Sequence, residues 1–170
     1  MPINLELKIN VKSHQIFRKK LKKIGAKTIG ILNQKDVYYK VPKGLLKLRI
    51  ENEKESLIFY SRDEARKNRW SNYDILKIEN GGSEKFLRKI FAIEIVVEKI
   101  RELFYFENTR IHLDKVKSLG YYLELETLVL QSKAEAMIRF DRIRNLLDLD
   151  ILKQIKKSYR DLLMQKKITL

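Results

Sequence analysis

The stretch EIVVEKIRELFYFENTRIHLDKVKSLGYYLELE, residues 94–126, decides the fold that this sequence predicts. It contains three runs in which charged and apolar residues alternate, a period typical of β-strands. Residues two apart in a strand share a face, so each run presents its charges on one side. The charges that share a face in each run are Lys99 and Arg101, then Arg110, His112 and Asp114, then Glu124 and Glu126. A polar wall that carries both signs of charge over several strands favours a cavity for a multiply charged ligand.

The preceding residues predict further strands of the same kind. Strand patterns cover residues 3–12, 28–41 (as one or two strands), 45–50, 56–62 and 70–78. In 45–50, Lys47 and Arg49 share a face, and in 56–62 Arg62 shares a face with Ile58 and Tyr60. Two neighbouring antiparallel strands would therefore each contribute cations to the same wall.

Helical patterns separate and follow these strands. We expect one helix after Ser13 that ends at Gly25, and a short one from Ser83 to Ala92. Two more follow at the C-terminus, one that Ser132 caps and one over residues 150–165. About eight antiparallel strands with few helices predict an α+β fold. Its centre would be an eight-stranded antiparallel β-barrel, or tunnel, with a polar charged interior, covered by a few helices including two at the C-terminus.

The composition excludes several classes of protein. The 170 residues include no cysteine, so there is no disulfide, thiolate nucleophile or cysteine-based zinc site. The first residues carry charges by position 6 and have no apolar core of signal-peptide length, so we expect no signal peptide, and no apolar run approaches the roughly 18 residues that span a bilayer. We therefore expect a cytoplasmic protein without membrane contacts. The sequence has no nucleophile-elbow, HExxH, Walker A or dinucleotide-binding motif.

The net charge of +15 and the isoelectric point near 9.9 favour anionic ligands such as nucleic acid, anionic lipid or phosphorylated small molecules. Much of the excess lies in predicted helices, where lysine and arginine usually form a solvated face. The chain has no zinc-finger spacing or RNA-recognition motif, so no specific nucleic acid is expected as a partner. RNA binding through the basic helices stays an alternative, and it predicts an affinity that falls steeply with salt.

The polar faces gather acids and bases that a triphosphate and a divalent metal would neutralise together. The acids are Glu6, Asp114, Glu124 and Glu126, and the bases are Lys8, Lys47, Arg49, Arg62, Lys99 and Arg101. Arginine suits two-point contact with phosphate oxygens, lysine supplies a point charge, and carboxylates suit Mg²⁺ or Mn²⁺.

Seven pieces of the sequence carry, in order, a resemblance to a known family. They are NLELK (4–8), LKLR (46–49), YSR (60–62), EKIR (98–101), RIHLD (110–114), LGYYLELE (119–126) and SYRDLL (158–163). Together they resemble the CYTH superfamily of triphosphate tunnel metalloenzymes, which includes class IV adenylate cyclase and thiamine triphosphatase. The resemblance covers nearly the whole chain and implies a single CYTH-like domain over residues 1–170. It also implies an eight-stranded antiparallel tunnel that binds a triphosphate with Mg²⁺ or Mn²⁺.

The resemblance assigns roles to the residues of the polar faces. It implies metal ligation by Glu6, Glu124 and Glu126 with help from Asp114, and phosphate binding by Lys8, Lys47, Arg49, Arg62, Lys99 and Arg101. It implies that Lys8, Arg62 and Lys99 are catalytic. The family's first motif is E-x-E-x-K, and here Asn4 stands where the first Glu is expected, which puts one of two metal sites in doubt. Leu45 stands at a position that is often basic.

Because SYRDLL and the chain length resemble the branch of class IV adenylate cyclase, we expect an activity of that kind, which converts ATP to cyclic AMP and pyrophosphate. The rival is a hydrolase of tripolyphosphate or thiamine triphosphate, since a water could attack the terminal phosphorus in the same site. Asn4 keeps open a non-catalytic sensor that binds nucleotides or polyphosphate. A homodimer stays open as well.

The remaining histidines and tyrosines have simpler explanations. His112 shares a face with Asp114, and a hydrogen-bonded packing role is favoured over that of a general base. His14, at the start of a predicted helix, is expected on the surface. The tyrosine pairs 38–39 and 121–122 are expected in the core and the cavity wall rather than as platforms for a nucleobase.

Overall fold

The computed structural model describes residues 4–60, 73–79 and 81–168. Its strands are β1 (Asn4–Val11), β2 (Lys27–Tyr39), β3 (Leu45–Glu51), β4 (Lys54–Tyr60), β5 (Tyr73–Ile78), β6 (Ile93–Phe106), β7 (Thr109–Val116) and β8 (Gly120–Leu128). Its helices are α1 (Gln15–Lys23), α2 (Ser83–Ile90), α3 (Lys133–Leu146), the 3₁₀ turn η1 (Ile151–Lys153) and α4 (Tyr159–Ile168). None of these helices is long and apolar enough to cross a membrane. The prediction of an α+β fold with eight strands is confirmed.

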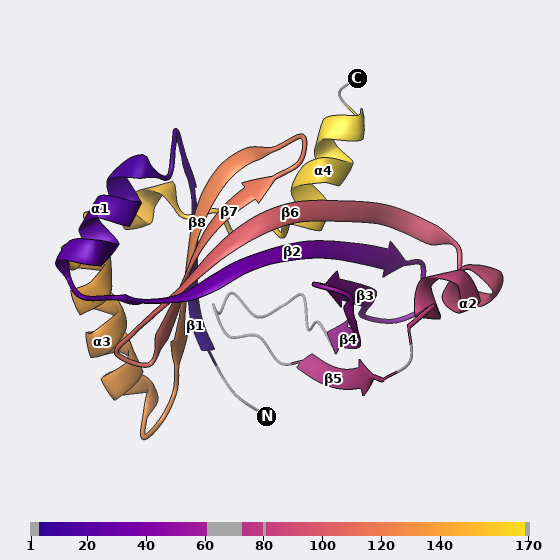
Figure 1. The fold of residues 1–170 in the computed structure, drawn as a ribbon, viewed down its shortest axis with the longest axis horizontal. Helices are drawn as coiled ribbons and strands as arrows, with labels where there is room; N and C mark the ends of the chain where they lie inside the picture. The colour runs from indigo at the N-terminus through magenta and orange to yellow at the C-terminus, as the bar shows by residue number, and fades with distance from the viewer. Residues whose placement is uncertain (1–3, 61–72, 80, 169–170) are drawn as a thin grey trace.

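All eight strands join one antiparallel sheet, in the order β1-β8-β7-β6-β2-β3-β4-β5. The two longest strands, β2 and β6, pair with each other and run across the whole molecule (Figure 1). The second half of β6, residues 99–106, pairs with β7, and the last residues of β2, 34–39, pair with β3. The sheet therefore has two halves, β7-β8-β1 and β3-β4-β5, at opposite ends of a central ribbon.

The sheet is tunnel-like because its two halves face each other. Tyr60 of β4 lies within electrostatic reach of Glu6 on β1 and Glu126 on β8. Among the described strands, hydrogen bonding runs from β1 to β5 without a pair between those two, so the sheet is not strictly closed.

Most buried apolar side chains of β1, β3, β7 and β8 pack outward against the helices, whereas Ile29 and Ile31 of β2 and Ile75 and Leu76 of β5 are exposed. Under α1 and α3 lies the largest cluster, which contains Leu5, Leu7, Ile9, Ile111, Leu113, Leu123, Leu125, Leu21, Phe140 and Ile143. A second cluster lies under α2, where Leu87 packs against Val37, Tyr39 and Leu48. The helix α4 instead covers part of the inner face, where Tyr159 and Leu163 join Tyr38, Ile95 and Val97. Burying the outward residues leaves the charged residues of the same strands on the inner face.

The helix starts differ in part from the predictions. Ser132 caps α3, because its Oγ accepts a hydrogen bond from the Glu135 amide at 3.1 Å, as expected. The N-cap of α1 is His14 rather than Ser13, and it makes no side-chain capping bond. At α2 the N-cap is Gly82, and the Glu55 carboxylate of β4 accepts from the amides of Gly82 and Ser83. A strand thus supplies a cap that the local sequence does not reveal.

The last helix begins later than predicted. Residues 151–153 form only a short 3₁₀ turn, with Asp150 as its N-cap, and α4 starts at Tyr159. Ser158 and Asp161 form a reciprocal cap, since the Ser158 Oγ accepts from the Asp161 amide and the Asp161 carboxylate accepts from the Ser158 amide, both at 3.1 Å. This capping box fixes the start of α4.

The prediction that His14 lies on the surface is wrong. Its side chain is 3% exposed, and its ring packs edge-on against Tyr121 with 5.0 Å between ring centroids. Its Nε2 lies 3.1 Å from the carbonyl oxygen of Tyr122. The turn into α1 folds back onto β8, which a helix-start position alone could not indicate.

Candidate functional site

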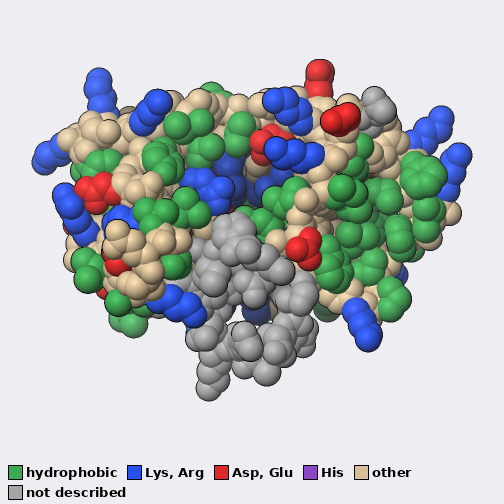
Figure 2. All heavy atoms as spheres, turned by 90° about the horizontal axis from the view of Figure 1, so that it is seen from below, with side chains coloured by type: hydrophobic (Ala, Val, Ile, Leu, Met, Phe, Trp, Pro, Cys, Tyr) green, Lys and Arg blue, Asp and Glu red, His purple; other side chains and the backbone are tan. Residues whose placement is uncertain are grey.

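The strand register places charged and polar residues of neighbouring strands side by side on the inner face. The facing pairs are Glu6 with Glu126, Lys8 with Glu124, Glu124 with His112, Glu126 with Arg110, Asp114 with Arg101, Lys99 with Gln34, Asp36 with Arg49 and Tyr38 with Lys47. Six of the eight strands thereby contribute to one polar surface. In Figure 2, Lys and Arg side chains lie in the hollow between the two halves of the molecule.

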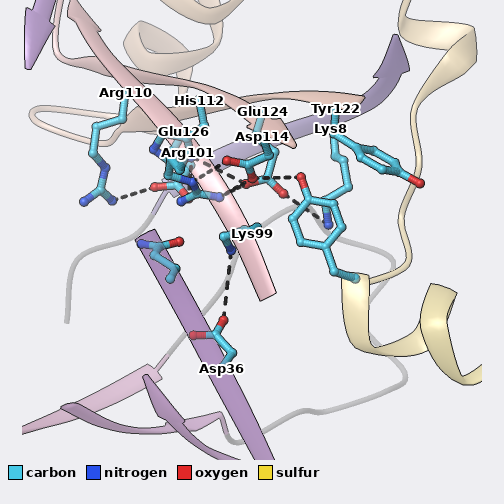
Figure 3. Close-up of polar contacts among 12 residues, drawn as sticks. Lys8, Asp36, Lys99, Arg101, Arg110, His112, Asp114, Tyr122, Glu124 and Glu126 are labelled. Carbon is cyan, nitrogen blue, oxygen red and sulfur yellow. Dashed lines mark hydrogen bonds and ion pairs between the residues drawn. The ribbon is translucent and has the colours of Figure 1, made fainter. Parts of the chain in front are cut away.

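Arg101 of β6 is the centre of one part of this surface. Its Nε and Nη2 donate to the two oxygens of Asp114 on β7 at 2.7 and 2.6 Å, and Nη2 also donates to Glu124 of β8 at 2.7 Å (Figure 3). The hydroxyl of Tyr159 on α4 donates to Asp114 at 2.9 Å. Burial raises the pKa of Asp114, but Arg101 outweighs it and holds the pKa below its usual range. Arg101, Asp114 and Glu124 stay charged because each has a partner of opposite charge.

Lys8 of β1 adds a second cation next to Glu124 in this part of the surface. Its Nζ lies 3.3 Å from Glu124, donates to the Lys157 carbonyl at 3.1 Å and sits 4.3 Å from the centroid of the Tyr159 ring. Although burial opposes it, the charge of Lys8, followed by that of Arg101, holds the pKa of Glu124 well below its usual range. Glu124 is therefore an ionised carboxylate within a few ångströms of two cations.

His112, Glu124 and Glu126 could hold a metal ion. One ligand atom from each of the three residues lies within 4.8 Å of the others. The His112 Nδ1 is 3.4 Å from Glu124 and 3.7 Å from Glu126, while Arg110 pairs with Glu126 at 2.8 Å. Two carboxylates and one imidazole suit Mn²⁺ and, through the oxygens, Mg²⁺. The donor set therefore fits a divalent ion.

A further feature near these acids fits the same ion. Asn4 lies on the inner face of β1, two residues before Glu6, and is 1% exposed. Its Oδ1 is buried and has no hydrogen-bond partner in the described structure. A buried carbonyl oxygen without a donor is costly, so a cation or a water there would satisfy it.

Asp36 of β2 organises the other part of the surface. The Arg49 Nε and Nη2 each donate to it at 2.8 Å, Lys47 donates at 3.0 Å, and the Lys99 Nζ lies 4.0 Å away. Burial raises the pKa of Asp36, but Lys47 and then Arg49 outweigh it and hold that pKa well below its usual range. Three cations from two other strands thus converge on a single buried carboxylate.

Lys99 is a buried cation of the site whose pKa is strongly lowered. Its side chain is 4% exposed, and burial, together with the nearby Arg101 charge, lowers its pKa to about 7, although Asp36 opposes the change. Its Nζ also lies 5.2 Å from the Tyr159 ring centroid. At neutral pH this amine can both hold and release a proton, unlike an ordinary lysine.

Nine of the ten predicted site residues lie on this inner face. Eight of them are joined by the contacts above: Lys8, Lys47, Arg49, Lys99, Arg101, Asp114, Glu124 and Glu126. Glu6 is half-buried beside Glu126 in the register. The tenth, Arg62, lies outside the described residues. Tyr38, Tyr39 and Tyr122 are buried in the apolar clusters or the wall, as predicted.

Asp36 is the main residue of this surface that the sequence analysis missed. Aspartate is disfavoured inside strands, so an aspartate two residues before Tyr38 in a predicted strand was the available signal. His112 is 2% exposed and hydrogen-bonded, as predicted, but it also belongs to the group that could hold a metal.

Comparison with known proteins identifies a matching family and several solved structures with the same fold. The sequence matches the CYTH domain family over residues 2–159. A search of curated proteins found no match. Among solved structures, the PH1012 protein of Pyrococcus horikoshii OT3 is 23% identical with a TM-score of 0.81, over 94% of this chain and 98% of that one.

Two further solved structures share the fold. A candidate adenylate cyclase from Vibrio parahaemolyticus is 19% identical with a TM-score of 0.78, over 95% of this chain and 98% of that one. A candidate adenylyl cyclase from Hippeastrum, whose dominant activity is that of a triphosphatase, is 13% identical with a TM-score of 0.70, over 98% and 96%. At these identities the likeness concerns the fold alone.

Proposed function

The chain belongs to the CYTH domain family, and from that premise we propose that it is a metal-dependent enzyme that acts on a triphosphate in its inner cavity. The leading activity is that of a class IV adenylate cyclase, which converts ATP to cyclic AMP and pyrophosphate. The observation that carries the proposal is the convergence of cations and carboxylates from six strands on one face, at contacts of 2.6 to 4.0 Å. An interior of this kind matches a ligand that brings both negative charge and a cation.

One group of residues binds the phosphates and a second group binds the metal ion. The phosphates are bound by Lys8, Lys47, Arg49, Lys99 and Arg101, with Arg62 added from the sequence. A divalent ion, Mg²⁺ or Mn²⁺, would be held by Glu124 and Glu126 with Glu6, Asp114 and His112 beside them, and when bound it neutralises phosphate charge. The oxygen of Asn4 adds a neutral ligand at most, which favours one strong metal site.

The residues of the chain contribute position and charge rather than covalent chemistry. In the cyclase reaction the ribose 3′-hydroxyl attacks the α-phosphorus and pyrophosphate leaves. Lys8 and Lys99 are assigned catalytic roles, with Arg62 as a third. Because its pKa is about 7, Lys99 can give a proton to a developing phosphate charge at neutral pH. Arg101 and Arg49 orient the phosphates through planar guanidinium groups.

Hydrolysis of tripolyphosphate or thiamine triphosphate is the second candidate. The triphosphatase activity named for the Hippeastrum protein supports it, because that chain shares the fold. In this reaction a water attacks the terminal phosphorus, and the same cations bind the leaving phosphates. A binding protein without turnover is the third outcome.

A single assay separates these outcomes. Purified protein is incubated with Mg²⁺ or Mn²⁺ and with ATP, tripolyphosphate or thiamine triphosphate between pH 7 and 10, and cyclic AMP, pyrophosphate and orthophosphate are resolved by ion-exchange chromatography. Cyclic AMP with pyrophosphate identifies a cyclase, and orthophosphate identifies a hydrolase. Tight binding by calorimetry without either product identifies a sensor. If Glu124→Gln and Arg49→Ala are as active as the parent, the activity does not belong to this site.

A further inference from the structure

Asp36 is less exposed than Arg49, the cation with which it forms two hydrogen bonds. Its side chain is 3% exposed, whereas that of Arg49 is 22% exposed. Lys47 and Lys99 are 6% and 4% exposed and approach the same oxygen, Oδ2. The Arg49 guanidinium is therefore more accessible to an incoming anion than the carboxylate that it contacts.

The geometry of Arg49 leaves part of its guanidinium for a ligand. The bonds to Asp36 use the Nε and Nη2 edge of the planar group. The Nη1 side is directed away from that edge by the fixed fork geometry. A carboxylate that fixes one edge of an arginine therefore also fixes the direction in which the other edge donates.

We propose that Asp36 is a positioning residue of the phosphate site: it stays bound to Lys47 and Arg49 when a triphosphate enters, and it holds both cations where they contact the phosphate oxygens. This inference rests on the function proposed above. It assigns Asp36 the same part toward Arg49 that Asp114 plays toward Arg101 on the other side of the cavity. The two arginine–aspartate pairs orient one guanidinium in each half of the sheet.

The alternative is that Asp36 merely competes with the ligand for its cations. In that case neutralising Asp36 adds one positive charge to the site and releases its partners, so an anion would bind more tightly. If Asp36 positions the cations, neutralising it leaves Lys47, Arg49 and Lys99 without their shared anchor, and an anion would bind more weakly. The two hypotheses therefore predict opposite changes in anion affinity when Asp36 is neutralised.

The test measures tripolyphosphate binding by calorimetry, without metal and with Mg²⁺, in the parent protein and in Asp36→Asn. We expect Asp36→Asn to weaken binding by about tenfold or more, both with and without metal. The matched control is Glu102→Gln, which removes the carboxylate from another two-bond arginine pair, Arg18–Glu102, on the outer face. Its affinity should stay within about twofold of the parent.

A double-mutant cycle asks whether Asp36 acts through Arg49. In the Arg49→Ala background, Asp36→Asn should change the affinity by less than about threefold, because the main oriented group is already gone. A purely structural role would instead lower the fraction of folded protein, and binding per folded molecule would be unchanged. Circular dichroism melts of each variant supply that fraction.

Asp36→Glu keeps the inference testable if Asp36→Asn does not fold. It retains the buried negative charge but displaces the carboxylate by one methylene, so the cations stay neutralised but move. We expect a folded protein with binding weakened by several-fold. Parent-like or tighter binding in Asp36→Asn or in Asp36→Glu would overturn the positioning role. A parent protein that binds no tripolyphosphate at all would overturn the proposed function as well, so the two failures are distinct.

Discussion

Arg101 and Asp114 form a two-bond pair in the interior, with Nε–Oδ1 and Nη2–Oδ2 distances of 2.7 and 2.6 Å and side chains that are 7% and 0% exposed. The Arg101 Nη2 also reaches Glu124 at 2.7 Å. One cation therefore compensates two carboxylates inside the protein. Pairs of this kind matter mainly when they are broken, because removal of one partner leaves the other charged and buried.

Replacement of Arg101 with methionine should therefore destabilise the fold by about 3–5 kcal/mol, the range for breaking a buried ion pair. Methionine fills a similar volume, so the change removes the charge with little loss of packing. Urea unfolding followed by circular dichroism measures the difference. Arg18→Met is the control, since Arg18 is 52% exposed and its pair with Glu102 should contribute no more than about 1 kcal/mol. Equal losses in the two variants would contradict a special role for the buried pair.

The Lys99 amine should make stability rise with pH above neutrality. Its folded-state pKa is about 7 and its ordinary value is 10.5, so between these values the unfolded chain binds a proton that the folded chain lacks. Stability from this group is therefore lowest below pH 7 and increases from about pH 7 to 10.5. Urea unfolding of the parent and of Lys99→Met at pH 7, 8 and 9 measures this pH dependence of the free energy of unfolding. The parent should gain stability relative to Lys99→Met over this range; parallel curves would contradict the shifted pKa.

Much of the fold is predictable because strand period and helix pattern are local properties of the sequence. The alternation in residues 94–126 correctly identified the inner face of β6, β7 and β8, and the pair Lys47 and Arg49 identified that of β3. Helix starts were less predictable where a distant residue acts. The carboxylate that caps α2 belongs to Glu55, 27 residues before Gly82.

Site residues were predicted correctly where charges alternate regularly along a strand. A site residue was missed where it is the single charge on its face of the strand. Asp36 has no charged neighbour two residues away in its strand, since Gln34 and Tyr38 flank it on that face. Only the register of β2 with β3 reveals that it meets Arg49. Similarly, the burial of His14 depends on its contact with Tyr121, more than 100 residues later. Such long-range contacts carry no local signature.

Removal of an acid near His112 should weaken the binding of a metal ion even when no triphosphate is present. Titration of Mn²⁺ into chelator-treated protein, followed by electron paramagnetic resonance, measures the free ion directly. Glu126→Gln should lower the affinity by about tenfold or more, because it removes one of three ligand atoms that lie within 4.8 Å of one another. Glu135→Gln is the control, since the Glu135 carboxylate pairs with Arg139, four residues later on α3, and lies outside the group around His112. Unchanged Mn²⁺ affinity in Glu126→Gln would place the ion elsewhere.

The hydroxyl of Tyr159 should be the main polar contact that holds the start of α4 on the site. It donates to Asp114 at 2.9 Å, and burial, followed by the charge of Glu124, raises its pKa well above the usual range, so it remains a neutral donor. Tyr159→Phe removes this bond to a buried carboxylate but keeps the ring beside Lys8 and Lys99. We expect a loss of about 1.5–3 kcal/mol, the range for a hydrogen bond to a charged group.

Hydrogen exchange locates that loss. Amides of α4 should exchange faster in Tyr159→Phe, whereas those of the cluster under α1 and α3 should change less, because α4 packs on β6 and the inner face and not on that cluster. Tyr105→Phe is the control, since its hydroxyl donates to Asn108 on the exposed surface at 2.7 Å. If α4 exchanges at the parent rate in Tyr159→Phe, its position depends on Leu163 and on the Arg160–Glu94 pair instead. The hydroxyl would then serve only to stabilise the ionised form of Asp114, and its loss should appear as a raised Asp114 pKa rather than as a mobile helix.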